Sequence, residues 1–274
     1  MAYLRKFGPA AGIAAVLVWL ASLIGAPLQA QPAASLPAIV PFKVFAADGK
    51  TPLYLGEYRV ERNGAEIAES ERYQTPQGKL AKLDESVYDA ERRRPVSFSS
   101  ANYLTGEVYR VTVKGDALSW RSEDAAGALK SSAEDSVPSG TFLWPNLAHL
   151  LSQEWEKIAG GQPVSVGLYV VSQKMKVGLD LKPDGTAEVG GVPGIRVKIQ
   201  PSSLLFRQLA GDAWMTLAVE PPHRVLRFEG KGVVKGADGK DVASVIVFDW
   251  ALAQAGAPPC VLVACSDVPR PPAN

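Results

Sequence analysis

Two cysteines and two histidines are the residues of this 274-residue chain best suited to redox or metal chemistry. Cys260 and Cys265 lie close together near the C-terminus, with four residues between them. In an oxidising compartment an even number of cysteines predicts a disulfide, and the alternative is two free thiols in a loosely held tail. A redox-active pair is disfavoured, because its usual spacing is Cys-x-x-Cys.

Motifs for catalysis or cofactor binding are not found in the sequence. Residues 163–167 lack the first glycine of a Gly-x-Ser-x-Gly nucleophile elbow, and residues 230–236 have one residue too many for a dinucleotide fingerprint. His149 is expected on the solvated face of a helix, and His223 in a turn after two prolines. We therefore expect no metal, no cofactor and no enzymatic activity. An enzyme that uses acids scattered over a sheet is the least favoured alternative.

Glu154 is the carboxylate whose position is hardest to explain as an ordinary surface residue. At about 100° per residue it falls in the middle of the apolar stripe of the helix expected over 145–160. A carboxylate there must be paired, protonated or facing a cavity. We expect either an ion pair with a basic residue, most plausibly from Met175–Leu181 or Ile195–Gln200, or a position facing a ligand. The run Arg92–Arg94 is interpreted as a solvated turn rather than an anion site.

Aromatic residues fall repeatedly on segments that have the pattern of strands. Most of them are expected to belong to the core. A curved sheet held by few helices also has a concave face that such side chains would line as a pocket. With Glu154, the candidate ligand-lining residues are Tyr58, Tyr109, Trp120, Tyr169, Trp214 and Phe228.

Alternation of apolar and polar residues at period two dominates the chain from about Pro52 onwards. Leu53–Arg62 is followed by Asn63-Gly64, which predicts a hairpin with a type I′ turn. Met175–Leu181 alternates clearly, and Pro183-Asp184-Gly185 is expected to end that strand. Further strands are expected at Lys79–Tyr88, Val96–Tyr103, Glu107–Lys114, Ala117–Ser122, Ala128–Ser136, Ile195–Gln200, Trp214–Val219, Val225–Gly230 and Val242–Trp250.

Helical spacing interrupts this pattern in two places. Apolar residues recur at helical intervals from Leu147 to Ile158, between a proline and two glycines. A shorter helix is expected from Ser202 or Ser203 to Leu209, with Gly211 as its stop. The predicted fold is therefore mainly β: a curved antiparallel sheet, a half-barrel or clamshell, with one clear and one short α-helix.

The N-terminus has the three parts of a secretory signal peptide. Arg5 and Lys6 precede an apolar stretch over 10–25, and Ala30 offers a small residue at a cleavage point. An uncleaved membrane anchor is the alternative, although the apolar stretch is short for one. We expect a protein of the periplasm or a secreted protein, with no integral membrane segment after cleavage.

The chain divides by composition into four parts. These are a signal peptide at 1–30, an Ala/Pro-rich linker at 31–50, a single β domain at 51–252, and a Pro-rich tail at 253–274 that holds the cysteine pair. Lys and Arg number 29 against 28 for Asp and Glu, a net charge of +1. Without a strong positive field, nucleic acid is not an expected partner.

Three segments carry a resemblance to a known family. They are Tyr58–Gly64 in the opening hairpin, the helix around Trp155, and Gln200–Phe206 leading to Arg224–Gly230. With them, the order of parts resembles the periplasmic β-clamshell proteins of the lipoprotein-carrier-like superfamily, and its uncharacterised exported bacterial members in particular. The resemblance implies a curved sheet closed by helices around a hydrophobic cavity that holds acyl chains or hydrophobic partners. The chain departs from the lipid-anchored members, because it has no modifiable cysteine near its start.

Two functional hypotheses follow from these patterns. The first is an exported, non-enzymatic binding or carrier module for a lipid-like or hydrophobic ligand. The alternative is an envelope protein that takes part in protein–protein interaction or assembly, presenting an edge or face of its sheet to an envelope protein.

Overall fold

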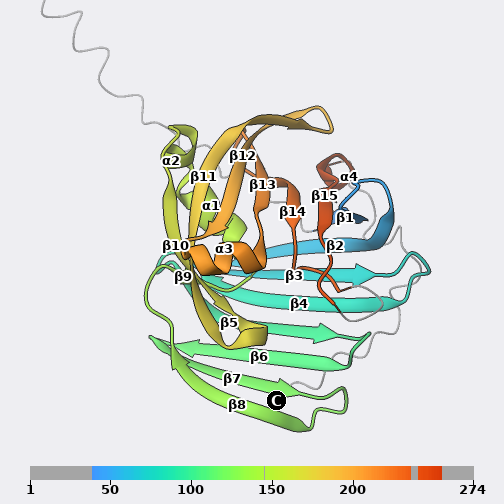
Figure 1. Ribbon diagram of the computed structural model, residues 1–274, viewed down its shortest axis with the longest axis vertical. Coiled ribbons are helices and arrows are strands. Elements are labelled where there is room, and N and C mark those ends of the chain that lie inside the picture. Colours follow the sequence, from blue (N-terminus) through green and yellow to red (C-terminus); the bar gives the residue numbers. More distant parts are fainter. Residues whose placement is uncertain (1–38, 145, 236–239, 255–274) are drawn as a thin grey trace, which may run out of the picture. The chain divides into compact units, whose positions relative to one another are not determined.

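The computed structural model describes residues 39–144, 146–235 and 240–254 (Figure 1). These residues form one sheet of fifteen strands in the order β8-β7-β6-β5-β4-β3-β2-β1-β15-β14-β13-β12-β11-β10-β9. The strands are β1 (Ile39–Ala46), β2 (Pro52–Asn63), β3 (Glu66–Gln74), β4 (Leu80–Asp89), β5 (Arg94–Asn102), β6 (Glu107–Lys114), β7 (Ala117–Glu123), β8 (Leu129–Ser136), β9 (Thr141–Phe142), β10 (Val164–Val170), β11 (Met175–Val189), β12 (Val192–Pro201), β13 (Ala213–Ala218), β14 (Val225–Gly230) and β15 (Ser244–Phe248). The expected signal peptide at 1–30 and the Cys260/Cys265 pair lie outside the described residues.

The mainly β, curved antiparallel fold predicted from the sequence is confirmed. Successive strands pair as an antiparallel meander, except that β8 and β9 lie at the two ends of the strand order, that β9 and β10 are parallel and that β1 pairs with β15. In Figure 1, β2–β8 run across the view whereas β10–β15 run up it, so the sheet curves strongly between its two halves. In the described part of the chain, no helix is long and apolar enough to cross a membrane.

The sheet begins earlier than the sequence predicted. β1 lies inside the segment 31–50 that was expected to be a linker, and it pairs with both β2 and β15. Its residues Val40, Phe42 and Val44 are at most 2% exposed. The Phe42 ring fits because Gly56 faces it from β2, where a Cβ atom would come within 2.1 Å of the ring. The Ala- and Pro-rich residues before Pro41 concealed the alternation that starts at Ile39.

Two predicted turns differ in detail. In the β2–β3 hairpin Asn63 pairs with Glu66, so the central residues are Gly64 and Ala65 rather than Asn63 and Gly64. Gly64 has a φ of +64° at the first central position, which is the place that type II′ turns give to glycine. Residues 183–185 do not end their strand: they form an irregularity within β11, which continues to Val189.

The clear helix predicted over 145–160 is two short helices, α1 (Leu147–Gln153) and α2 (Trp155–Ala159), separated at Glu154. The shorter predicted helix is confirmed as α3 (Leu204–Ala210), which follows Ser203 and ends before Gly211 at a φ of +73°. α4 (Trp250–Gln254) was not predicted, because Trp250 was assigned to the last strand and the residues from 253 onwards to the tail. A 3₁₀ turn, η1 (Val171–Gln173), follows β10.

The inner face of the sheet, which carries the hydrophobic clusters, is covered by the chain's own side chains. The main cluster contains residues of β1–β3 and β10–β15. α1 and α2 add five buried residues to it: Leu147, Leu150, Leu151, Trp155 and Ile158. A second cluster joins Phe98 and Trp120 to Tyr169 and Val171. The Trp120 indole N–H donates to the Val171 carbonyl at 2.7 Å, so β7 contacts η1, directly after β10, through a side chain.

Candidate functional site

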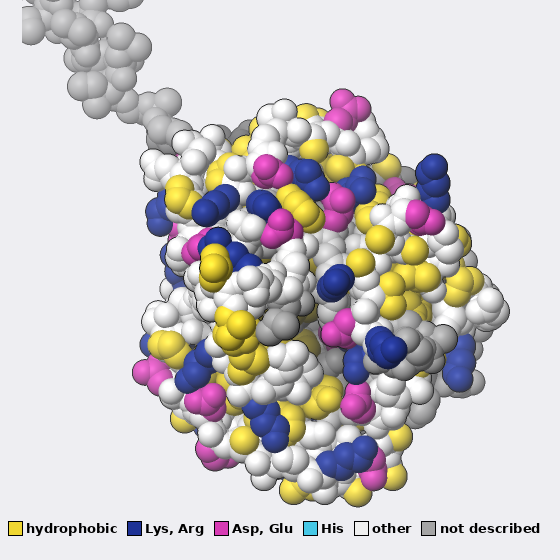
Figure 2. Space-filling model, in the orientation of Figure 1, with side chains coloured by type: hydrophobic (Ala, Val, Ile, Leu, Met, Phe, Trp, Pro, Cys, Tyr) yellow, Lys and Arg dark blue, Asp and Glu magenta, His cyan; other side chains and the backbone are white. Residues whose placement is uncertain are grey.

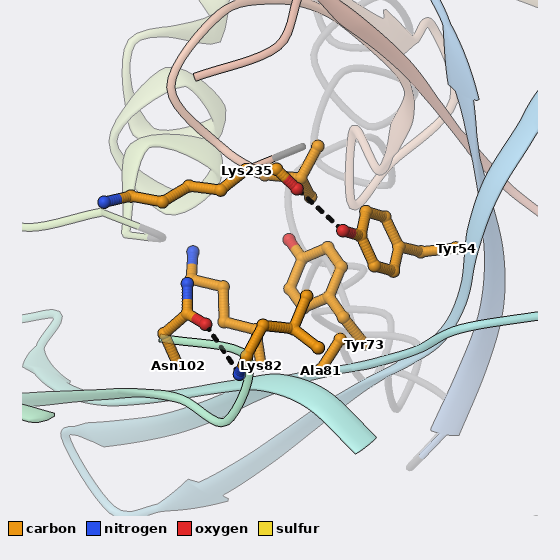
Figure 3. A pocket seen from close by; sticks show the side chains of 8 residues that line it. Tyr54, Tyr73, Ala81, Lys82, Asn102 and Lys235 are labelled. Carbon is orange, nitrogen blue, oxygen red and sulfur yellow. Dashed lines mark hydrogen bonds between the residues drawn. The ribbon is translucent and has the colours of Figure 1, made fainter. Parts of the chain in front are cut away.

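A small pocket, part of it open to solvent, lies on the inner face next to the segment that follows β14. Its lining residues come from β2–β5, from the turn after β5 and from residues 234–235 (Figure 3): Tyr54, Tyr73, Ala81, Lys82, Asn102, Leu104, Val234 and Lys235. Aromatic and aliphatic groups form the surface of this lining, to which Lys82 and Lys235 contribute their stems, because their ammonium groups pair with Asp84 and Glu107. The pocket therefore offers surface for an apolar chain.

We call Val233–Lys235 the cover segment. The Tyr54 hydroxyl donates to the Lys235 carbonyl at 2.7 Å (Figure 3), and Lys82 Nζ donates to the Val233 carbonyl at 2.9 Å. Lys235 Nζ lies 3.4 Å from Glu107 Oε2 on β6. Side-chain contacts thus hold the cover segment against β2, β4 and β6. In the residues that the structure describes, it is not paired with those strands through backbone hydrogen bonds.

Two buried carboxylates lie beside the pocket. Glu71 of β3 and Asp84 of β4 are cross-strand partners, and they are 6% and 0% exposed. The Tyr73 hydroxyl donates to Glu71 Oε2 at 2.6 Å, and Lys82 Nζ lies 2.7 Å from Asp84 Oδ2. Burial, followed by the negative charge of Asp84, raises the pKa of Glu71 from 4.5 to about 7. The pocket residues Tyr73 and Lys82 thus contact the two buried carboxylates directly.

Glu69 is the centre of a second buried polar group on the same face. Its carboxylate accepts hydrogen bonds from the Tyr58 hydroxyl and from Asn146 Nδ2, the latter at 2.8 Å, and His149 Nε2 is 3.4 Å away. Asn146 Nδ2 also donates to Ser86 Oγ at 3.0 Å. Asn146 precedes α1 but makes no capping hydrogen bond with its side chain, which is wholly buried. A residue suited to capping is therefore used to bind Glu69 instead.

The two histidines are less exposed than the sequence predicted. His149 was expected on a solvated face, but its ring stacks on that of Tyr88, with centroids 6.4 Å apart, and its side chain is 15% exposed. His223 does lie in a turn, and its ring stacks on Trp155 at 3.9 Å. Helical phase placed His149 away from the leucines of α1, but β4 covers that side of the helix as well. Among the described residues, no group of three or more His, Cys, Asp or Glu is arranged to hold a metal ion.

Of the seven residues proposed from the sequence as ligand-lining, three are brought together in one cluster, and none is among the lining residues of this pocket. Tyr109, Trp120 and Tyr169 belong to the second hydrophobic cluster or contact it. Phe228 lies in the main cluster with its ring 5.1 Å from Trp144, and Tyr58 binds Glu69. Trp214 donates to Asp184 at 2.9 Å and lies under the Arg196 guanidinium. These side chains are largely packed against the protein itself.

The residues that line the pocket, and the acids beside it, were not predicted from the sequence. Ile67, Glu69, Glu71 and Tyr73 occupy alternate positions of β3 and share one buried face. The same alternation places Asp84 on the buried face of β4. The alternation of residues along a strand was used to assign aromatic side chains to a face. The same rule, used for the carboxylates, would have placed these acids on the inner face.

Glu154, the seventh proposed residue, makes the ion pair that was one of its two predicted roles. It is 8% exposed and contacts Arg93, while Lys157 Nζ lies 2.6 Å from its Oε2. Neither partner comes from Met175–Leu181 or Ile195–Gln200, because Arg93 lies in the β4–β5 turn and Lys157 in α2. Arg92–Arg94 is accordingly not merely a solvated turn: Arg94 also pairs, with Asp116 at 2.7 Å.

Replacing Glu154 by Gln is expected to lower the free energy of unfolding by about 1–2 kcal/mol at neutral pH, because two partly exposed cations lose a buried partner. The hydrogen bond from Lys157, more than that from Arg93, lowers the pKa of Glu154 below 4.5. A depressed pKa gives stability that is present above 4.5 and lost as pH falls through the folded-state pKa, so the difference between variant and wild type should vanish in strong acid. Denaturant melts across pH would measure this, with the exposed Glu156→Gln on the same helix as the control. A Glu154→Gln protein as stable as wild type at neutral pH would contradict the ion-pair role.

Two solved structures are among those to which this chain is similar. A β-barrel-like protein of the domain of unknown function DUF1849 from Brucella abortus aligns with a TM-score of 0.47 and 9% identity, covering 78% of this chain and 99% of that chain. The lipoprotein LppX of Mycobacterium tuberculosis aligns with a TM-score of 0.25 and 12% identity, covering 77% of this chain and 85% of that chain. No protein-family model and no curated protein sequence matches this chain. Its function is therefore argued from its own side chains.

Proposed function

We propose that this chain is an exported, non-enzymatic binding or carrier module for a lipid-like or hydrophobic ligand, which binds between the cover segment and β2–β5. The observation that carries the proposal is the lining of the pocket. Tyr54, Tyr73 and Leu104 offer surface to an apolar chain, and the stems of Lys82 and Lys235 extend that surface. Export follows from the signal-peptide pattern at 1–30.

The size of the pocket determines how such a ligand would bind. The space within it measures about 10 Å³, room for about one water molecule, which is far below the roughly 300–1,000 Å³ that is usual for ligand pockets. Val233 and Val234 of the cover segment belong to the main hydrophobic cluster. An apolar chain that displaced them would contact the same neighbours. Binding therefore requires the cover segment to move, and the ligand replaces its valines.

An enzymatic role has less support. It would call for two or more carboxylates within the pocket, each with a shifted pKa. The residues lining this pocket include no carboxylate, because Glu71 and Asp84 are connected to it through Tyr73 and Lys82.

The proposal predicts that Leu104→Trp blocks ligand binding. Leu104 lines the pocket and is 41% exposed, so a larger side chain there can obstruct the pocket with little effect on the core. Titration with a fluorescent fatty-acid analogue should give saturable binding to wild type and binding weakened by at least about tenfold in the variant. Leu129→Trp is the matched control, since Leu129 is a 61% exposed leucine of β8 outside the pocket. Equal binding by wild type and both variants would place the ligand elsewhere.

The envelope interaction function remains the second candidate, and the exposed apolar side chains of α3 favour it. Leu204 and Leu205 are 72% and 64% exposed, an unusual position for two adjacent leucines. Figure 2 shows acidic and basic side chains interspersed on the face that it views, so no single-sign field dominates that face. A protein cross-linked through α3 in the envelope, together with no ligand binding by wild type, would favour this function over the carrier.

A further inference from the structure

The Glu71–Asp84 pair has an arrangement that is electrostatically unfavourable when both carboxylates are charged. They face each other in register across β3 and β4, and both are buried. Cross-strand neighbours of like charge destabilise a sheet, and burial increases the repulsion between them. Asp84 Oδ1 has no hydrogen-bond partner among the described residues. A protonated Glu71 would supply a donor next to that acceptor.

The groups that face Glu71 come from three strands. Tyr58 comes from β2, Glu69 and Tyr73 from β3, and Asp84 and Lys82 from β4. α1 contributes Asn146 and His149, which contact Glu69. Lys82 supplies the positive charge nearest to the pair. With Glu71 and Asp84 both ionised, one ammonium faces two carboxylates, and the three groups together carry a net negative charge in a buried site.

Lys82 also connects the pair to the cover segment. Its Nζ lies 2.7 Å from Asp84 Oδ2, 2.9 Å from the Val233 carbonyl and 5.4 Å from the centre of the Tyr73 ring. Tyr73 in turn donates to Glu71 and lines the pocket. A movement of Val233–Lys235 would therefore remove one contact of Lys82 and let water reach the side chains that separate the pocket from the acids.

We infer that proton binding by the Glu71–Asp84 pair controls the cover segment, which stays closed while the pair holds a proton and loosens when both carboxylates are ionised. The direction follows from burial, which is the largest cause of the raised pKa of Glu71. Opening hydrates the pair and so favours its ionised form. By linkage, a rise in pH through neutrality then favours the open form. The biological purpose of this control, regulated exchange of a ligand, depends on the proposed function.

The test is amide hydrogen exchange of the ligand-free protein, with rates corrected for the effect of pH on intrinsic exchange. Protection of a peptide containing Val233–Lys235 should fall by about tenfold between about pH 6 and about pH 8, whereas peptides from β11 and β12 should be unaffected. Glu71→Gln should abolish the pH dependence, and Asp84→Asn serves as a second variant if the first does not fold. Glu85→Gln, an exposed carboxylate on the opposite face of β4, should retain it. Equal protection at both pH values in wild type, or unchanged pH dependence in Glu71→Gln, would overturn the inference.

The same samples separate this inference from the proposed function. A pH-dependent cover segment in a protein that never binds the fatty-acid analogue would leave the inference standing and contradict the carrier function. Binding of the analogue with dissociation rates equal at both pH values would support the carrier function and contradict proton control.

Discussion

Replacing Glu71 by Gln is expected to raise the free energy of unfolding by about 3 kcal/mol at about pH 8, since each unit of pKa shift corresponds to about 1.4 kcal/mol. Burial and the neighbouring Asp84 raise the pKa of this carboxyl from 4.5 to about 7. The folded state therefore binds more protons than the unfolded state between these two values. Stability is full below 4.5 and is lost as pH rises through 7. Gln avoids the buried charge and can donate a hydrogen bond to Asp84.

Denaturant melts of wild type and Glu71→Gln over the range from about pH 4 to about pH 8 would measure this effect. The variant's advantage should shrink to near zero at the acid end, because both side chains are then neutral. Glu85→Gln, on the solvent side of the same strand, should follow wild type throughout. A Glu71→Gln protein less stable than wild type at about pH 8 would contradict this prediction. It would show that groups other than Tyr73 and Lys82 stabilise the negative charge of Glu71.

Replacing Glu69 by Gln is expected to have the opposite sign, lowering the free energy of unfolding by about 2–4 kcal/mol at neutral pH, because buried donors lose a charged acceptor. Glu69 lies two residues before Glu71 on the same face, but two donors converge on it: the Tyr58 hydroxyl and Asn146 Nδ2. They bind different carboxylate oxygens, so an amide would turn its own N–H groups towards one of them.

A double-mutant cycle with Tyr58→Phe would isolate the hydrogen-bond network from a general effect on packing. The two substitutions should be less than additive, since each removes the same hydrogen bond. Glu66→Gln, at the exposed end of the same strand, should leave stability within about 0.5 kcal/mol of wild type. Strict additivity of Glu69→Gln and Tyr58→Phe would mean that the pair is not coupled.

The strands could be predicted because their information is local. Glu107–Lys114 and Val225–Gly230 have the predicted bounds, since they alternate at period two. Gly106 and Gly115 flank the first strand, and Pro221-Pro222 precedes the second. β1 was missed because Ala and Pro before Ile39 resemble a linker. The continuation of β11 through Pro183 depends on pairing with β12, which a sequence pattern does not contain.

The pocket could not be predicted, because its contacts join distant parts of the chain. Lys82 and Val233 are 151 residues apart, and Tyr54 and Lys235 are 181 residues apart. For Glu154, helical phase correctly predicted a buried position, but the identity of its partner Arg93 depends on how the β4–β5 turn meets α1. Local pattern thus indicates which face a residue occupies, whereas the register of the whole sheet determines what it contacts.

The central claim, that this chain carries a lipid-like ligand, is tested most directly by what the protein holds when it is isolated. The mature protein, purified from the envelope without detergent, would be extracted with organic solvent and the extract analysed by mass spectrometry. We expect a lipid-like species in near-stoichiometric amount from wild type and much less of it from Leu104→Trp. Repeated preparations of wild type that yield no such species, together with no binding of the fatty-acid analogue, would contradict the carrier function.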